Sequence, residues 1–269
     1  MMQKNYRLLM TRTVLLLILG LALSACGGDS SEDGASDTSD TNIESNREGY
    51  EWRRSRTTLE VSPDSDPSVN GNMEIDPAEV DVQFTTVFTV RPDNDSLEDE
   101  ELPVLDGKVR IGLGEAGASR DEDFEWIELT HQGEGVYAGS ARGVADVYRA
   151  TAEAPGLKPA SNTTNSASIA RIISPVQGES YPRRKKLSIS FEPIEAKVRA
   201  EALLNGRMLS GANTASEKEE LSISAAWLQE TANDQAIGLK RRNGSVSLGS
   251  GGESYVEFIV LREVNVNIQ

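Results

Sequence analysis

Apolar and polar residues alternate with a period of two through most of the chain beyond residue 57. From Val80 to Val90, most apolar residues occupy even positions, and polar residues such as Gln83 occupy odd ones. Such segments, interrupted by Gly, Asp and Asn, predict antiparallel strands with one buried face. In the first half of the chain the predicted strands are 80–90, 109–113, 124–129, 136–138 and 144–152.

A second set of alternating segments begins at Ile169. Residues 224–230 break the alternation and predict one helical turn. Its Trp227 is expected to fill the core of this half, as Trp126 is in the first half. The predicted strands here are 172–174, 187–191, 198–204, 221–223, 237–239 and 255–268.

Three short segments predict tight turns between strands. Asn205-Gly206 and Asn243-Gly244 are dipeptides typical of two-residue hairpins, because both residues tolerate positive φ. Residues 131–135, His-Gln-Gly-Glu-Gly, predict a further hairpin turn between the strands at 124–129 and 136–138.

A Pro-, Ser- and Asn-rich break at 153–167 separates the two sets of strands and is typical of an interdomain linker. The pattern predicts an all-β protein with two antiparallel β-sandwich domains, an acidic one at 59–160 and a second at 166–269.

The second domain resembles the immunoglobulin-like and fibronectin-III-like modules of bacterial surface proteins. The residues that carry this resemblance are I-x-S-P-x-x-G-E at 172–179, L-x-I-x-F-E-P at 187–193 and V-x-V-x-I at 264–268. They describe strand ends and core positions, so the resemblance implies a fold and no activity. Without a second cysteine, an antibody-type disulfide core is excluded.

The N-terminus combines a basic start with a short apolar run from Val14 to Leu23, the pattern of a secretory signal. The run is too short for a transmembrane helix of about 20 residues. Residues 23–26 resemble the bacterial lipobox at every position: Leu23, Ser24, Ala25 and Cys26.

The lipobox resemblance implies that residues 1–25 are a signal peptide cut before Cys26, and that acyl chains of the palmitate type are attached there. Gly27, rather than Asp, follows the cysteine. By resemblance to the sorting rule of enteric bacteria, this implies the outer membrane of a Gram-negative bacterium. The alternative is an ordinary secretory signal.

Residues 26–58 are dominated by Ser, Asp, Gly, Glu, Thr and Asn and show no apolar period. Such a segment cannot bury enough surface to offset its chain entropy, so a disordered acidic tether is expected. Tyr50 and Trp52 near its end either mark the edge of the first domain or form a headgroup- or partner-binding patch. The whole layout resembles uncharacterised two-domain envelope lipoproteins.

The chain has one cysteine and one histidine, Cys26 and His131. This composition excludes zinc sites built from Cys and His, together with most Ser-His-Asp and Cys-His mechanisms. His131 lies in a Gly-rich turn, where an exposed structural role is favoured. No cofactor-binding motif is present, since Gly112-Leu113-Gly114 lacks the further glycines and helix of a phosphate loop.

Charge is divided unevenly between the two halves. Residues 59–165 carry 7 basic and 23 acidic side chains, whereas residues 166–269 carry 13 and 12. Nucleic acid is therefore a poor partner for this chain. Weak calcium candidates lie in the acidic loop after Pro92, at Asp93, Asp95 and Asp99, but their spacing is not that of an EF-hand.

Two basic runs, 183–186 and 240–242, border strands of the second domain. They either dock on the acidic domain, bind phosphate-rich lipopolysaccharide, or lie as solvated edges that block strand pairing. We therefore expect a lipid-anchored, non-enzymatic interaction or structural module, with another envelope protein or a polysaccharide as partner. Carbohydrate binding through an exposed aromatic residue is the alternative, and a hydrolase using paired carboxylates is a third.

Overall fold

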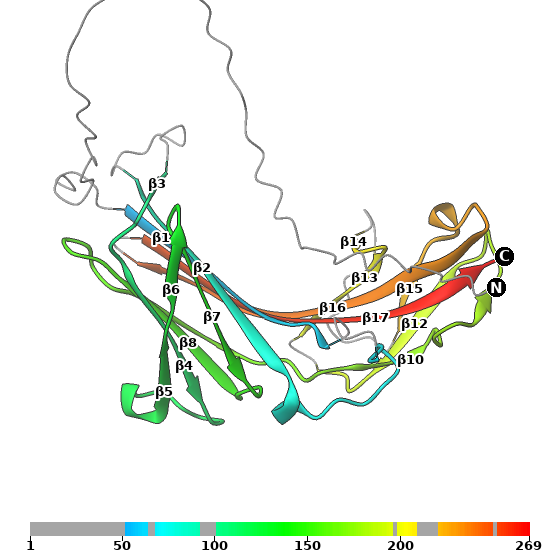
Figure 1. The fold of residues 1–269 in the computed structure, drawn as a ribbon, viewed down its shortest axis with the longest axis horizontal. Helices are drawn as coiled ribbons and strands as arrows, with labels where there is room; N and C mark the ends of the chain where they lie inside the picture. The colour runs from blue at the N-terminus through cyan, green and yellow to red at the C-terminus, as the bar shows by residue number, and fades with distance from the viewer. Residues whose placement is uncertain (1–51, 64–67, 92–100, 196–197, 209–219, 250–251) are drawn as a thin grey trace, which may run out of the picture. The chain divides into compact units, whose positions relative to one another are not determined.

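The computed structural model describes residues 52–63, 68–91, 101–195, 198–208, 220–249 and 252–269. The lipobox residues Leu23, Ser24, Ala25 and Cys26 lie outside these ranges, as do the calcium candidates Asp93, Asp95 and Asp99. The described chain is all-β, as the alternation predicts (Figure 1). None of its segments forms a helix long and apolar enough to span a bilayer.

Seventeen strands and three short 3-10 turns make up the described structure. The strands are β1 (Trp52–Val61), β2 (Asp81–Arg91), β3 (Leu102–Pro103), β4 (Lys108–Gly114), β5 (Phe124–Glu128), β6 (Thr130–Gly133), β7 (Val136–Arg142), β8 (Val147–Glu153), β9 (Ala160–Asn165), β10 (Arg171–Ser174), β11 (Ser180–Tyr181), β12 (Leu187–Glu192), β13 (Arg199–Leu204), β14 (Arg207–Met208), β15 (Glu220–Ile223), β16 (Ala232–Gly249) and β17 (Gly252–Ile268). The 3-10 turns are η3 (Pro77–Glu79), η4 (Asp121–Asp123) and η5 (Ala225–Trp227).

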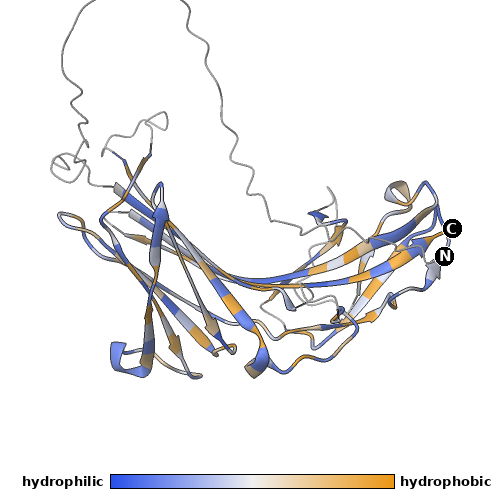
Figure 2. Ribbon diagram, viewed as in Figure 1, coloured by the Kyte–Doolittle hydropathy of each residue, from blue (hydrophilic) through white to orange (hydrophobic). Residues whose placement is uncertain are grey.

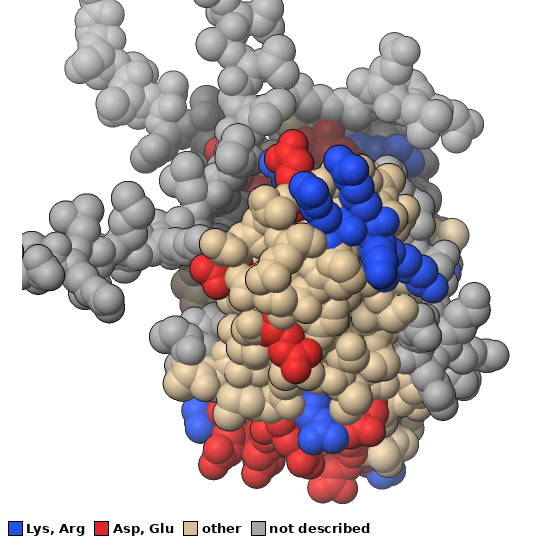
Figure 3. Space-filling model, turned by 90° about the vertical axis from the view of Figure 1, so that its right-hand side faces the viewer, with Lys and Arg blue, Asp and Glu red and all other residues tan. Residues whose placement is uncertain are grey.

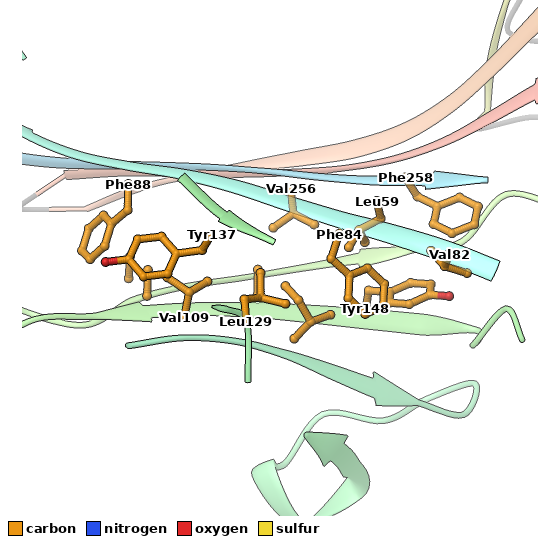
Figure 4. Packing of buried hydrophobic residues seen from close by; sticks show 14 of the residues in the cluster. Leu59, Val82, Phe84, Phe88, Val109, Leu129, Tyr137, Tyr148, Val256 and Phe258 are labelled. Atoms are coloured by element: carbon orange, nitrogen blue, oxygen red, sulfur yellow. The ribbon is translucent and has the colours of Figure 1, made fainter. Parts of the chain in front are cut away.

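The first hydrophobic core lies between two sheets. One is a ten-stranded sheet with the order β14-β13-β16-β17-β1-β2-β7-β6, and the other has four strands in the order β5-β4-β8-β9. β2 shows strict alternation, with Val82, Phe84 and Phe88 buried (Figure 2). Val82 and Phe84 lie near Tyr148 and Phe258, whose rings stack with centroids 5.3 Å apart, whereas Phe88 lies beside Tyr137 in the same core (Figure 4).

The second core lies between another part of the ten-stranded sheet and a three-stranded sheet with the order β10-β12-β15. Leu187, Ile189 and Phe191 of β12 are all buried there, as their alternation predicts. Opposite them, β13, β16 and β17 contribute alanine, valine, leucine and isoleucine side chains. Both cores are therefore sandwiches between stacked sheets.

The last strand, β17, takes part in both cores. Val256, Phe258 and Val260 of β17 are buried in the first, whereas Val264 and Ile268 are buried in the second. The expected range 166–269 thus contributes strands to both sandwiches, and the two share one continuous sheet. Because apolar and polar residues alternate along most of β17, its sequence pattern does not indicate where the first core ends and the second begins.

Two arginines occupy the buried face of the β16–β17 hairpin at the point where it passes from one core to the other. Arg262 lies between Val260 and Val264 on β17 and is 2% exposed, and Arg241 of β16 is 1% exposed. Both share the parity of the apolar side chains on their own strands. A guanidinium at such a position must find acceptors, because an unpaired buried charge is very costly.

The acceptors are backbone carbonyls of the two segments that cross between the sandwiches. Arg262 donates to Ala170 O at 2.7 Å, to Asn70 O at 2.7 Å and to Met73 O at 2.9 Å. Arg241 donates to Ser168 O at 2.5 Å. The hairpin therefore holds the segment between β1 and β2 and the segment between β9 and β10.

The second basic run, 240–242, is consequently not a solvated edge. Arg241 is buried, and its guanidinium lies 3.6 Å from Glu195. Arg242 forms ion pairs with Glu201 at 2.9 Å and Glu257 at 3.5 Å. These residues lie on β16, inside the ten-stranded sheet, and the charges of Arg241 and Arg242 are paired with carboxylates of the fold.

The expected tether 26–58 is too long at its C-terminal end, because β1 begins at Trp52. β1 pairs with β17 in parallel and with β2 in antiparallel orientation. The buried positions of β1 that fall within the expected tether are polar: Ser55 Oγ lies 3.2 Å from Ser254 Oγ, and Thr57 Oγ1 lies 2.9 Å from Thr86 Oγ1. Hydroxyl pairs satisfy one another across strands, so the segment forms a strand without an apolar pattern.

The expected linker 153–167 is also partly wrong, because β9 (Ala160–Asn165) is a strand paired with β8. Its polar side chains close one side of the first sandwich. Asn162 Nδ2 donates to Ser245 O and to Ser254 O, each at 2.9 Å. Ser245 Oγ donates to Thr163 O at 2.6 Å. The Asn and Thr residues that suggested a linker are hydrogen-bonding partners of the hairpin edge.

The two Asn-Gly turn predictions have different outcomes. Asn205-Gly206 forms the predicted hairpin between β13 and β14, with φ of 50° and 72°. Asn243-Gly244 does not turn: it lies inside β16, opposite Phe258 and Glu257. The Asn243 amide donates to Asn165 O at 3.2 Å, so its side chain joins the polar closure with β9.

The third turn is shorter than the segment 131–135 suggested. His131 and Gly133 belong to β6, and the turn residues are Glu134 and Gly135, with φ of 50° and 71°. The hairpin joins β6 to β7, whereas β5 pairs with β4 in the other sheet. The chain changes sheets at Leu129, whose buried side chain lies in the first core.

Replacing Arg262 with Met should lower the free energy of unfolding by about 2–4 kcal/mol, since three carbonyls lose a charged donor. The exposed Arg56 on β1 offers a matched control, and Arg56→Met should change stability by less than about 0.5 kcal/mol. Urea unfolding of the unlipidated chain measures both. Equal effects of the two substitutions would contradict the role given to Arg262.

Replacing Asn162 with Ala should cost about 1–2 kcal/mol, because two hydrogen bonds to the hairpin edge are lost. Amide hydrogen exchange should speed up in 243–249 and 252–256, and remain unchanged in β12 of the second sandwich. Ser161→Ala, at an exposed position of the same strand, is the control. Unaltered exchange at the hairpin would show that β9 does not close this side.

Candidate functional site

Four consecutive cationic side chains, Arg183, Arg184, Lys185 and Lys186, are all exposed in the turn between β11 and β12. We call these residues the basic patch. Figure 3 shows Lys and Arg side chains gathered on one part of the face that it presents. Here the sequence prediction of a solvent-facing basic run is confirmed at 183–186.

Backbone hydrogen bonds fix the basic patch on two sides. The Arg183 N–H donates to Gln269 O at 2.6 Å, and the Arg184 N–H donates to Leu228 O at 2.7 Å. Arg184 takes a left-handed conformation with φ of 59°. The cations are therefore presented by a turn that is tied to the end of β17 and to the residue after η5.

Trp227 lies at the same end of the three-stranded sheet. Leu187 at the start of β12 pairs with Ile223 at the end of β15, and η5 follows directly. Trp227 is 48% exposed, so the prediction that it fills the core is wrong. Leu228 is buried in its place, because neighbouring residues of a 3-10 turn point in directions about 120° apart.

Trp126 of β5 is only partly exposed, and its ring is already in use. Its Nε1–H donates to Asp121 O at 3.1 Å, and the Arg110 guanidinium lies 5.0 Å from its ring centre. This cation–π contact covers one face of the indole. Of the two tryptophans predicted for the cores, Trp227 is the one that offers an open aromatic surface.

A hollow of about 1190 Å³ lies at one end of the first sandwich, between η3, the β4–β5 connection and the β7–β8 connection. Its lining includes five carboxylates and two guanidinium groups: Asp76, Glu115, Asp123, Glu125, Asp146, Arg120 and Arg142.

Several of these carboxylates stabilise the loops that carry them. Asp146 accepts from the Ala116 N–H at 3.0 Å, and Asp76 accepts from the Ala78 N–H at 2.9 Å. Asp123 accepts from the N–H groups of Arg120 at 2.8 Å and Ser119 at 3.0 Å. The backbone donors of Arg120 and Ser119 lower the pKa of Asp123 to about 2. The acidic rim is thus built into the turns.

Among the described residues, no group of three or more His, Cys, Asp or Glu side chains is arranged to hold a metal ion. Glu101, at the end of the predicted calcium loop, forms an ion pair with Arg54 and accepts from Thr89 Oγ1 at 2.9 Å. His131 is exposed on β6, with its ring 5.0 Å from that of Tyr137. Glu101 and His131 are therefore not part of a metal-binding group among the described residues.

No family model matches the chain, and no curated protein does. Among solved structures it is similar to murine CEACAM1b, with 9% identity and a TM-score of 0.23, over 80% of this chain and 100% of that one. It is also similar to the fibronectin(III)-like modules of Clostridium thermocellum CbhA, with 13% identity and a TM-score of 0.21, over 76% and 93%. For DIP-gamma IG1+IG2 the identity is 10% and the TM-score 0.20, over 81% and 95%. Function is therefore argued from the chain's own residues.

Asp123 should titrate near pH 2, since its pKa is lowered by the donors of the η4 turn. A carboxylate with a lowered pKa stabilises the fold above its unfolded value, and this contribution is lost as the pH falls through the folded value. Carboxyl carbon chemical shifts measured by NMR give the pKa directly. A value in the ordinary range near 4 would contradict the capping role of Asp123.

Proposed function

We propose that this protein is a lipid-anchored protein of the cell envelope, whose two fused β-sandwiches act as a non-enzymatic interaction or structural module. The observation that carries the proposal is the lipobox-like segment Leu23-Ser24-Ala25-Cys26, which ends an apolar run and holds the chain's one cysteine. Because there is no second thiol, a disulfide role does not compete for Cys26.

Lipid on Cys26 supplies the anchoring energy. One acyl chain gives marginal, reversible membrane binding, whereas two or three chains give lasting attachment at about 0.8 kcal/mol per buried methylene. Gly27 after the cysteine supports placement in the outer membrane of a Gram-negative bacterium.

Cys26 and β1 are separated by an acidic, low-complexity stretch. The 26 residues from Cys26 to Glu51 correspond to a coil of about 28 Å root-mean-square length, if they behave as a flexible chain. Such a spacer lets a folded module move over a range of distances from the lipid headgroups. The module is then free to meet another envelope protein, which is the class of partner that we propose.

The use of polar side chains supports a role without catalysis. Carboxylates around the hollow, such as Asp123 and Asp146, bind backbone N–H groups of their own loops. Buried cations such as Arg262 bind carbonyls of crossing segments. A general acid or base needs a titratable side chain within reach of a substrate, and these groups are engaged in holding the fold.

Carbohydrate binding is the second candidate, and the exposed indole of Trp227 favours it, because sugar rings stack on open aromatic faces. The neighbouring side chains are the cations of the basic patch. Guanidinium groups recognise phosphate more strongly than they recognise neutral hydroxyls. This candidate therefore stands second.

The Cys26→Ala chain, expressed in a Gram-negative host, should fail to incorporate labelled palmitate and should accumulate as an uncut precursor. Ser24→Ala is a matched control, because alanine satisfies the lipobox at that position and labelling should persist. Labelling, precursor processing and partition into outer membranes measure the outcome. Normal maturation and membrane partition of the Cys26→Ala chain would overturn the proposal.

A further inference from the structure

We propose that the basic patch and Trp227 form a second membrane contact, which binds the phosphate groups of an anionic phospholipid surface. This inference rests on the proposed anchoring of the chain in a membrane, and it names a surface that the folded part contacts. Phosphate-bearing lipid is the occupant because the patch combines clustered cations with an exposed indole.

The patch is the run of four consecutive cations in the second sandwich, and all four side chains are exposed. Other cations of this sandwich are engaged in the fold: Arg171 pairs with Glu192, Arg242 pairs with Glu201, and Arg262 binds backbone carbonyls. Single exposed cations such as Arg199 and Arg207 stand apart from this run in the sequence. Clusters of Lys and Arg near a membrane surface attract anionic headgroups, and each residue adds to the attraction.

Nearby carboxylates reduce this charge only in part. Glu179 and Glu230 flank the patch and η5 in the sequence, which leaves a net charge of +2 over the cluster. The Glu179 carboxylate accepts from the Tyr181 hydroxyl at 3.1 Å. The local field therefore favours anions, although residues 59–165 are strongly acidic.

Trp227 supplies the apolar component of an interfacial site. Its indole is 48% exposed, and the residue after it, Leu228, is buried in the core and accepts the Arg184 N–H. Tryptophan is enriched at headgroup depth, because its ring is apolar and its N–H is polar. Because backbone hydrogen bonds tie the turn at 183–184 to Leu228 and Gln269, little loop entropy is lost on binding.

The patch is within reach of the membrane that holds the lipid. β1 pairs with the start of β17 at Gly252, and β11 pairs with its end at Ile268. A strand of 17 residues spans about 55 Å at most. The 26 residues from Cys26 to Glu51 extend to about 85 Å. Tethering keeps the patch at high local concentration, so weak headgroup binding is sufficient.

The test uses the full mature chain carrying Cys26→Ala, so that attached lipid contributes nothing. Co-sedimentation is measured with vesicles of phosphatidylglycerol in phosphatidylcholine and with vesicles of phosphatidylcholine alone. We expect binding to the anionic vesicles, weakened by salt, and a blue shift of tryptophan emission. Trp227→Phe should remove most of that shift, since the emission change arises from its indole.

Neutralising the patch should weaken binding to anionic vesicles by at least about tenfold. The patch variant carries Arg183→Gln, Arg184→Gln, Lys185→Gln and Lys186→Gln. A control with the same change in net charge, placed at exposed cations elsewhere, carries Arg56→Gln, Lys158→Gln, Arg199→Gln and Arg207→Gln. Thermal unfolding of both variants verifies that they remain folded.

Three results would overturn the inference: equal binding to both kinds of vesicle, equal weakening by the patch and control variants, or binding to soluble polysaccharide with none to vesicles. The last result would favour the carbohydrate candidate. Because the tested chain carries no lipid, vesicle binding and palmitate labelling at Cys26 succeed or fail independently.

Discussion

The fold depends on two buried arginines at the middle of the β16–β17 hairpin. Arg262 stands on β17 between core residues of the first and the second sandwich, and Arg241 is buried on β16 beyond Ile237 and Leu239 of the second core, so the hairpin leaves the second core at a pair of charges. Carbonyls at residues 70, 73, 168 and 170 accept hydrogen bonds from their guanidinium groups. Since a buried charge without partners is very costly, the crossing segments and the hairpin must form together.

This constraint explains why the two sandwiches are coupled. In a chain of independent domains, each core closes over its own strands and a linker joins them. Here β17 carries core residues of both sandwiches, and β9 closes the first sandwich through Asn162 rather than linking it to the second. Local opening of the hairpin would expose both cores, so their stabilities are linked.

The sequence predicted elements well wherever burial is apolar and poorly wherever it is polar. Alternation identified β2 and β12, whose buried positions are valine, leucine, isoleucine and phenylalanine. It missed the start of β1 and all of β9, whose hydroxyl and amide side chains pair across strands. Trp227 shows the same limit, because a short 3-10 turn places either that residue or its neighbour in the core, and composition does not decide which. The resemblance of residues 23–26 to a lipobox, by contrast, rests on a linear motif that needs no tertiary information.

Net charge alone would argue against any contact between this chain and an anionic surface. However, electrostatic interactions between exposed charges are screened beyond about 8 Å at physiological ionic strength. The carboxylates of the first sandwich that bind their own loops, such as Asp123 and Asp146, belong to a different end of the sheet system from the turn before β12. The electrostatic attraction between this chain and an anionic surface therefore depends on the charged side chains nearest that surface and not on the net charge of the whole chain. In the second sandwich, Arg241 and Arg262 are buried within the fold. The run at 183–186 is therefore the densest group of exposed cations among the described residues of this sandwich.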